Sequence, residues 1–198
     1  MGLDLDYMEG QTPLEDDEKE GLLIPTIATR GELDEFEQQN IEDAVLWALG
    51  LSVKQELIFT EKFIKNVHIR MYGRVWSWAG TFRRTNKNIS VDKCQIPSEL
   101  KQLLDDAGYW YANATFLPDE MAVRFKHRLV SIHCFPNGNG RHSRLMADII
   151  IDKGYGLPPF TWGAGSLLQA GNTRTIYLNA VRAADRGDYA PLLAFARS

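Results

Sequence analysis

The feature that most constrains the fold is a twelve-residue run, 133–144, which lies between two segments of helical periodicity. The run reads HCFPNGNGRHSR. Apolar residues recur at helical spacing before it (Met121, Phe125, Leu129, Ile132) and after it (Leu145, Met146, Ile149, Ile150). A helix, a tight loop and a second helix are therefore expected, with glycines allowing a sharp turn.

The chemistry of this run is that of an anion site next to a base. A helix that starts at residues 138–140 presents free main-chain N–H groups and the positive end of its dipole. Arg141 and Arg144 are spaced i,i+3 and project from one side of that helix. Guanidinium groups pair well with phosphate oxygens. His133 titrates near neutrality and is a candidate general base. The simpler interpretations are a core histidine and two surface arginines.

The run resembles the signature of Fic domain proteins, which reads His, any, Phe, any, Asp or Glu, Gly-Asn-Gly-Arg, any two, Arg. The mobile mystery protein B-like subgroup is suggested by residues 12–14 (TPL) and 21–25 (GLLIP). The resemblance covers nearly the whole chain. It implies an all-α, Fic-type helical bundle with one short β-hairpin flap. The implied division is an acidic N-terminal arm, 1–25, and a Fic domain, 26–198.

The resemblance implies an enzyme, a protein adenylyltransferase. It would transfer AMP from ATP to a Tyr, Ser or Thr hydroxyl of a target protein. His133 would be the general base. The phosphates would be bound by residues of the loop and helix that follow: Gly138, Asn139, Gly140, Arg141 and Arg144. In the family, the first motif arginine grips the β-phosphate and the second the γ-phosphate. His142 is expected to face solvent or the nucleotide base.

Asn137 departs from the family pattern, which has a carboxylate at this position to hold Mg²⁺ against the phosphates. An amide oxygen carries no charge, and hard cations prefer charged oxygen ligands. Asn137 could bind Mg²⁺ weakly, leave Mg²⁺ to the phosphates, or slow turnover. The alternative function is accordingly a nucleotide-binding regulatory module with weak or lost catalysis, or another Fic-type phosphoryl or nucleotidyl transfer.

The helical period is lost between residues 80 and 97, where turn residues and β-formers predict a short hairpin or a plain loop. In Fic proteins a flap at this place holds the target by strand addition, so Ile89 and Val91 would flank the target. Many family members are restrained by a glutamate that pairs with the second motif arginine. Glu37 and Glu20 are the two candidates for such an inhibitory residue here; otherwise both are solvated acids.

Charge is unevenly distributed. Residues 1–24 hold eight acidic residues and one lysine, a net of −7, so the remainder carries +3 of the total of −4. A solvated arm is expected at the start, and the rest is too weakly basic to predict nucleic acid binding. Two cysteines, no secretory signal and no long apolar run predict a cytoplasmic protein that does not bind membranes. A small antitoxin or a DNA-binding regulator is a candidate partner.

Local signals predict the remaining elements. Thr29 and Glu32 have the spacing of a capping box, which predicts a helix from residue 30 with a buried apolar stripe (Leu33, Phe36, Ile41, Val45, Leu49). Ser98 is expected to start another helix, and Pro118 the one that leads to His133. Helices are also expected over 173–184 and, as a short last one, up to Phe195. Cys134 is interpreted as a small packing residue rather than a nucleophile.

Overall fold

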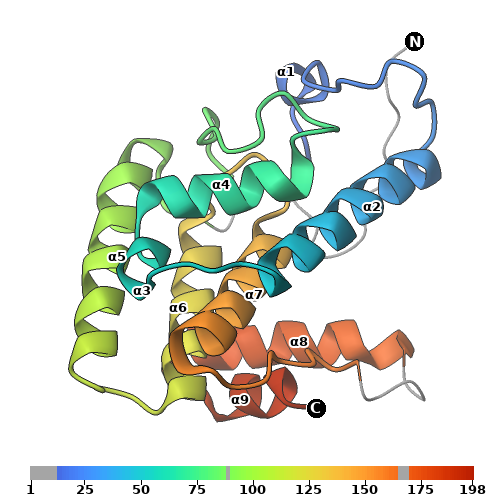
Figure 1. Ribbon diagram of the computed structural model, residues 1–198. Helices are drawn as coiled ribbons and strands as arrows, with labels where there is room; N and C mark the ends of the chain where they lie inside the picture. The colour runs from blue at the N-terminus through green and yellow to red at the C-terminus, as the bar shows by residue number, and fades with distance from the viewer. Residues whose placement is uncertain (1–12, 88–89, 165–169) are drawn as a thin grey trace.

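The computed structural model describes residues 13–87, 90–164 and 170–198, and there the chain is all-α as predicted (Figure 1). A 3₁₀ turn, Lys93–Gln95, and a π-helical turn, Ile150–Gly154, complete the regular structure of these residues. The helices are α1 Asp16–Lys19, α2 Arg30–Leu49, α3 Gln55–Ile58, α4 Glu61–Tyr72, α5 Ile96–Ala112, α6 Pro118–Ile132, α7 Asn139–Ile149, α8 Ala170–Ala184 and α9 Ala190–Ala196.

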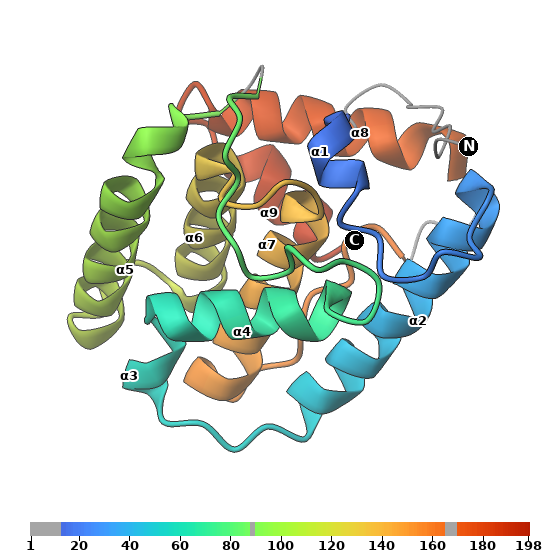
Figure 2. The same ribbon diagram turned by 90° about the horizontal axis from the view of Figure 1, so that it is seen from above.

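Helices α6 and α7 form the centre of the bundle and the other helices surround them. In Figure 1, α5 lies on one side of α6, while α4 and α2 cross the other end of the pair and α8 and α9 lie at its base. Figure 2 shows that α4 runs across the bundle and that the short α1 lies above it, near residues 80–87. The central position of α6 and α7 places the loop that joins them, 133–138, inside the assembly of α2, α4 and α7.

The start of α6 and its buried face are as the sequence predicts. Pro118 occupies the first turn, where its missing N–H group costs no hydrogen bond. The predicted apolar positions are all buried: Met121, Phe125, Leu129 and Ile132. Thr29 likewise caps α2, with Glu32 completing the capping box through the main-chain N–H of Thr29.

Of the predicted buried stripe of α2, Leu33 is buried and Ile41 is partly buried against the core, whereas the prediction is wrong for Phe36, Val45 and Leu49. Phe36 is 46% exposed and Leu49 is 54% exposed. The buried residues of this helix are instead Leu33, Glu37, Asn40, Ala44 and Ala48. Small residues let α2 approach α4 and α7 closely, and the two polar residues on this face need partners there. A glutamate on a buried helix face is a signal of function that apolar periodicity does not detect.

The β-hairpin predicted between residues 80 and 97 is not formed by the described residues of this segment, which contain no paired strand. The physical reason is the buried side chain of Arg83. Its guanidinium donates hydrogen bonds to the carbonyl oxygens of Thr85 (2.7 Å) and Val91 (2.5 Å), so a side chain rather than a strand ladder joins the two limbs. Ile89 lies outside the described residues, so its predicted role in docking a target is untested.

The described part of the acidic arm is folded onto the bundle rather than solvated throughout. Residues 16–19 form α1, and both Leu14 and Glu18 are buried. Residues 1–12 lie outside the described residues, and the boundary placed at 25/26 stays a prediction. None of the helices in the described part of the chain has the length and apolar character needed to cross a membrane.

Candidate active site

The loop between α6 and α7 begins and ends with a residue in the left-handed conformation. His133 ends α6 with φ 56°, and Gly138 precedes α7 with φ 78°. A Cβ at Gly138 would lie 2.5 Å from the ring of Tyr72, so both the backbone angle and the available space require glycine. The first intrahelical bond of α7 joins the His142 N–H to the Gly138 carbonyl at 2.9 Å, which leaves the preceding N–H groups at the end of the helix.

Asn139 shapes the loop with its side chain. Its Oδ1 accepts from the Phe135 N–H at 3.0 Å, and its Nδ2 donates to the Phe135 carbonyl at 2.8 Å. Phe135 is fully buried and stacks on His68 with ring centroids 3.8 Å apart. The loop is therefore closed by a two-bond amide clamp and pinned to the core by an aromatic ring, which limits how far its main-chain N–H groups can move.

His68, on α4, supports the same loop from below. The Gly80 N–H donates to Nδ1 at 3.0 Å, so Nε2 carries the proton and donates to the Asn137 carbonyl at 3.1 Å. Complete burial, with the neighbouring His142 adding to it, holds the pKa of His68 well below its usual range, so the ring is neutral. Sequence reasoning did not identify His68, because nothing in its local pattern distinguishes it from other helical residues.

His133 lies almost buried beside Arg83 and Lys87. Burial, with the positive charges of Arg83 and Lys87 adding to it, lowers the pKa of His133 to about 4. Arg83 Nε also donates to the His133 carbonyl at 2.6 Å, and the Arg83 N–H to the Cys134 carbonyl at 2.9 Å. The imidazole is thus neutral near pH 7, the state a general base requires, and its main chain is held by one buried arginine.

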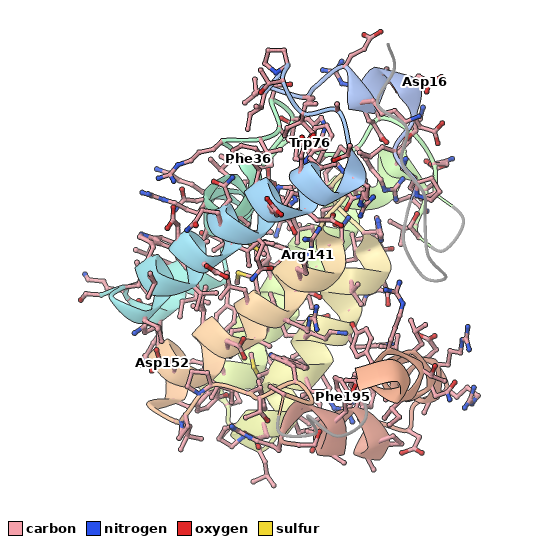
Figure 3. All side chains as sticks on the ribbon, turned by 90° about the vertical axis from the view of Figure 1, so that its right-hand side faces the viewer. Asp16, Phe36, Trp76, Arg141, Asp152 and Phe195 are labelled. Atoms are coloured by element: carbon pink, nitrogen blue, oxygen red, sulfur yellow. The ribbon has the colours of Figure 1, made fainter. Side chains whose placement is uncertain are left out.

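Arg141 points from the first turn of α7 toward α2 and pairs with Glu37 there (Figure 3). The Nη2–Oε2 distance is 2.7 Å, and the Glu37 side chain is only 6% exposed. The other oxygen of Glu37 accepts from the Trp76 indole N–H at 2.8 Å. Sequence reasoning expected Glu37 to pair with Arg144, and this is wrong: α2 passes the start of α7, where Arg141 is the arginine within reach.

Arg144 lies one turn further along α7 and faces α8. Its guanidinium lies over the ring of Tyr177 at 5.6 Å from the centroid. Lys126 of α6 donates to the hydroxyl of the same tyrosine at 2.6 Å, and burial, with the charge of Arg144 adding to it, lowers the pKa of Lys126 to about 7. Arg144 and Lys126 therefore share one aromatic partner, and an anion bound beside them would favour the charged form of Lys126.

Asn137 was the residue predicted to face a metal ion. Its Oδ1 accepts the Gly138 N–H at 2.6 Å, so the amide turns back onto the loop. Within the described ranges no group of three or more His, Cys, Asp and Glu side chains could hold a metal ion. The described residues around position 137 therefore offer no charged oxygen ligand set for Mg²⁺.

The hydroxyl of Tyr72 is buried and has no hydrogen-bond partner among the residues that the structure describes. It lies under Gly138, 2.7 Å from where a Cβ would be, and the guanidinium of Arg141 lies 5.3 Å from the ring centroid. A buried phenol without a partner costs about 1–3 kcal/mol. Tyr72 thus places an unused hydrogen-bond donor between the loop glycine and Arg141.

Three further interpretations can be compared with the structure. His142 was expected to face solvent or the nucleotide base; instead it is buried, with Nε2 3.0 Å from the Ile64 carbonyl. Cys134 is buried, which raises the pKa of its thiol to about 12 and agrees with a packing role. Glu20 is exposed at the end of α1 and forms no ion pair with an arginine in the part of the chain described; the buried acid of that helix is Glu18.

The fold thus brings together the residues that the sequence selected from 133–144 and adds others from distant segments. Glu37, one of the two candidate inhibitory residues named from the sequence, joins the site from α2. The main-chain carbonyl of Val91 reaches the site through Arg83. The residues that the sequence analysis did not select come from three separate segments: His68 and Tyr72 from α4, Arg83 from the segment after α4, and Lys126 from α6. Together they define an all-helical protein whose central loop presents a neutral histidine next to an arginine-bearing helix start.

Comparison with known proteins identifies this architecture. The Fic/DOC family model matches residues 58–151, which include α4 to α7 and the whole loop. A curated relative from Drosophila grimshawi, named protein adenylyltransferase Fic, is 28% identical over 167 residues, covering 82% of this chain and 33% of that protein. The Drosophila melanogaster relative of the same name is 27% identical. The chain spans about a third of the length of these relatives.

Solved structures show the same fold. Fic-1 from C. elegans superposes with a TM-score of 0.67 and 24% identity, covering 90% of this chain and 51% of that one. BepC from Bartonella tribocorum, solved with AMPPNP, has a TM-score of 0.65 and 18% identity, covering 91% and 95%. Residues 58–151 therefore match the Fic/DOC family, and the described part of the chain shares the fold of these Fic structures. The mobile mystery protein B-like subgroup is not tested by these likenesses and stays a prediction.

Proposed function

We propose that this chain transfers AMP from ATP to a hydroxyl side chain of a target protein. The observation that carries the proposal is the single loop that holds a neutral, nearly buried His133 at one end and the Gly138–Arg141 helix start at the other. The relatives named protein adenylyltransferase support the reaction, and the related Fic structures solved with AMPPNP and with ADP support the nucleotide.

The reaction is a substitution at the α-phosphorus. His133 takes the proton of the target hydroxyl, the oxygen attacks the α-phosphorus, and the bond to the β-phosphate oxygen breaks, so pyrophosphate leaves. The N–H groups at the start of α7, with Arg141 and Arg144, stabilise the negative charge on the phosphates. The loop clamp of Asn139 and the support from His68 hold these donors in place before substrate binds.

Isotope labelling tests this function directly. The purified chain is incubated with a cell lysate and either α-labelled or γ-labelled ATP. Label retained on protein from the α position alone is the result expected for AMP transfer. Label from the γ position alone means phosphorylation and overturns the proposal. The proposal includes a target protein as the first partner and an antitoxin or regulator as the second. It places the reaction in the cytoplasm.

A regulatory module that binds nucleotide and turns it over slowly is the second candidate function, favoured by Asn137. Restoring a carboxylate with Asn137→Asp should make ATP binding depend on Mg²⁺, because it supplies a charged oxygen ligand. We expect Mg²⁺ to tighten ATP binding by the variant about tenfold more than by the wild type. Calorimetry with and without Mg²⁺ measures this. The same Mg²⁺ response in both proteins would refute a role of residue 137 in metal binding.

Two tyrosines whose hydroxyl groups are buried without a partner among the described residues provide a matched pair of variants. Tyr72 lies at the phosphate site, whereas Tyr155 lies beside Tyr111 at the far end of the bundle. Each change to Phe should raise the free energy of unfolding by about 1 kcal/mol, because it removes an unsatisfied polar group. Only Tyr72→Phe should also weaken ATP binding, by roughly threefold to tenfold. Denaturant titration and calorimetry measure the two effects; unchanged ATP affinity in Tyr72→Phe would remove Tyr72 from the site.

A further inference from the structure

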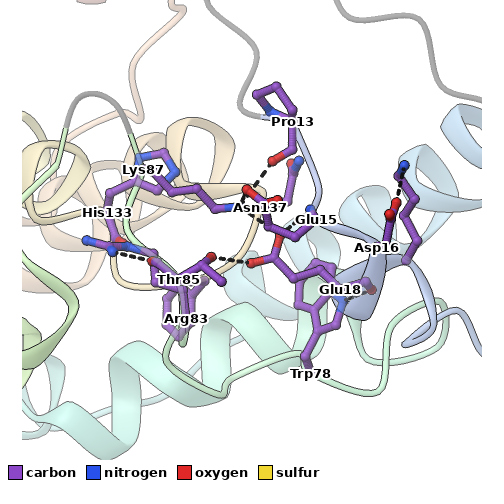
Figure 4. A network of polar contacts seen from close by, with 12 residues as sticks. Pro13, Glu15, Asp16, Glu18, Trp78, Arg83, Thr85, Lys87, His133 and Asn137 are labelled. Atoms are coloured by element: carbon purple, nitrogen blue, oxygen red, sulfur yellow. Dashed lines mark hydrogen bonds and ion pairs between the residues drawn. The ribbon is translucent and has the colours of Figure 1, made fainter.

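An N-terminal strap, defined as residues 13–20, lies across residues 83–87 next to His133 (Figure 4). Its contacts converge on Lys87. The Lys87 ammonium lies 2.8 Å from Glu18 Oε2, 3.5 Å from Glu15 Oε1 and 3.1 Å from the Pro13 carbonyl. Both partners of the shortest pair are shielded from water, Lys87 being 5% and Glu18 7% exposed. The strap thus encloses a lysine that would otherwise be free to bind an anion.

The Glu18 carboxylate is fully engaged by this surface. Its Oε1 accepts from the Thr85 hydroxyl at 3.1 Å, and its Oε2 accepts from the Glu15 N–H at 2.8 Å as well as from Lys87. An ion pair buried in this way is costly to break on one side only, because the remaining charge has no partner. The surface offers the carboxylate two side-chain donors, an ammonium and a hydroxyl, and these would serve any carboxylate of the right reach.

The strap and the chain that follows it are held by different kinds of contact. Beyond it, the main chain is fixed to the segment after α4: the Ser77 N–H donates to the Gly21 carbonyl at 2.8 Å, and the Leu23 N–H to the Val75 carbonyl at 2.8 Å. The strap itself is held by the charges of Glu15 and Glu18 on Lys87, by the buried side chain of Leu14, and by a hydrogen bond from the Trp78 indole N–H to the Glu18 carbonyl at 2.9 Å. Charge pairs can be exchanged for a competing acid, whereas the main-chain hydrogen bonds can stay, so residues 21–23 form a fixed hinge for a displaceable strap.

The covered surface adjoins the proposed base. Arg83, in the same segment, donates to the carbonyl of His133, and the charge of Lys87 contributes to the lowered pKa of that histidine. A pocket between the strap and residues 81–84 reaches Pro136 of the motif loop. A protein that brings a hydroxyl to His133 must lie over this region. The strap therefore covers part of the surface that a target would contact.

We propose that Lys87 and Thr85 form a docking surface for an acidic segment of a partner protein, and that the strap occupies this surface until such a segment displaces it. The occupant present in the chain argues for this chemistry, because residues 15–18 are Glu-Asp-Asp-Glu. The inference rests on the proposed function in one respect only, namely that the partner is the protein that this chain modifies. Binding of an acidic segment does not itself require catalysis.

The test uses the full chain and a fluorescent peptide with the sequence of residues 11–20, QTPLEDDEKE. Glu18→Gln should release the strap, so the peptide should bind this variant at least about tenfold more tightly than it binds the wild type. Asp16→Asn is the matched control, because Asp16 is 99% exposed and its ion pair is with Lys19. Fluorescence anisotropy measures the affinities, which should weaken with added salt. Equal binding to wild type and Glu18→Gln would overturn the inference.

A peptide with all four acids of residues 15–18 replaced by amides tests the chemistry of recognition. If this peptide bound Glu18→Gln as tightly as the acidic peptide does, charge recognition would be refuted.

The charge swap Glu18→Lys with Lys87→Glu independently tests the Glu18–Lys87 ion pair as the latch that holds the strap. Hydrogen exchange of residues 13–20 should speed up about tenfold in Glu18→Gln and return to near the wild-type rate in the double variant. No recovery in the swap would refute the pair as the latch. These measurements need no nucleotide, so their failure is distinct from failure of AMP transfer.

Discussion

Replacing His133 by alanine should lower the rate of target modification by a factor of about 10²–10⁴, the usual contribution of a general base. The variant should still bind ATP, because the proposed phosphate donors lie on α7 rather than on His133. The measurement is the initial rate of label transfer from α-labelled ATP, with calorimetry of ATP binding beside it. A variant that keeps more than about a tenth of the wild-type rate would show that His133 is not the base.

Cys134→Ala is the control for disturbance of the loop. Cys134 is the next residue, is buried, and has a thiol that burial keeps protonated, so its loss should leave the rate within about threefold. The pH profile gives a second check. Because burial and the charges of Arg83 and Lys87 lower the pKa of His133 to about 4, the base is neutral at and above pH 6. The rate should fall only as the pH approaches about 4, where the imidazole gains a proton; a fall centred near pH 6.5 would contradict this environment.

Replacing Glu37 by glutamine should raise ATP affinity by about tenfold, because Arg141 then loses a charged competitor for the phosphates. Glutamine keeps an oxygen for the Trp76 indole N–H, so the α2 contact is retained while the negative charge is removed. If Glu37 restrains activity, the rate of modification at low ATP should rise with it. Calorimetry and label transfer measure the two quantities.

Glu42→Gln is the matched control, because Glu42 lies on the same helix, is exposed and accepts only from Gln38 among the hydrogen bonds of the described residues. It should leave ATP affinity unchanged. Glu37→Gly also frees Arg141 but removes the partner of Trp76 and adds a helix-interior glycine, which costs about 1 kcal/mol, so it is the less specific variant. ATP affinity that is equal in Glu37→Gln and wild type would make the ion pair purely structural.

Local signals determined the helices that carry the site. The capping box at Thr29 and Glu32 sets the start of α2, and Pro118 sets the start of α6. The run 133–144 specified its loop and the helix after it, because glycine at 138 is required by its own backbone angle and by the ring of Tyr72. The helix starts and the left-handed turn at residue 138 depend on residues a few positions apart, and sequence patterns of that range are sufficient to predict them; only the contact with Tyr72 does not.

The tertiary structure alone decided which side chains meet. Glu37 pairs with Arg141 rather than Arg144, and the acid that reaches the segment after α4 is Glu18 rather than Glu20. The guanidinium of Arg83 replaces the expected hairpin ladder, and His142 turns inward to the Ile64 carbonyl. Buried polar groups must find partners wherever the packed helices place them, and those partners lie far away in the chain. No local pattern encodes such a pairing, because it follows from how α2, α4 and α7 pack.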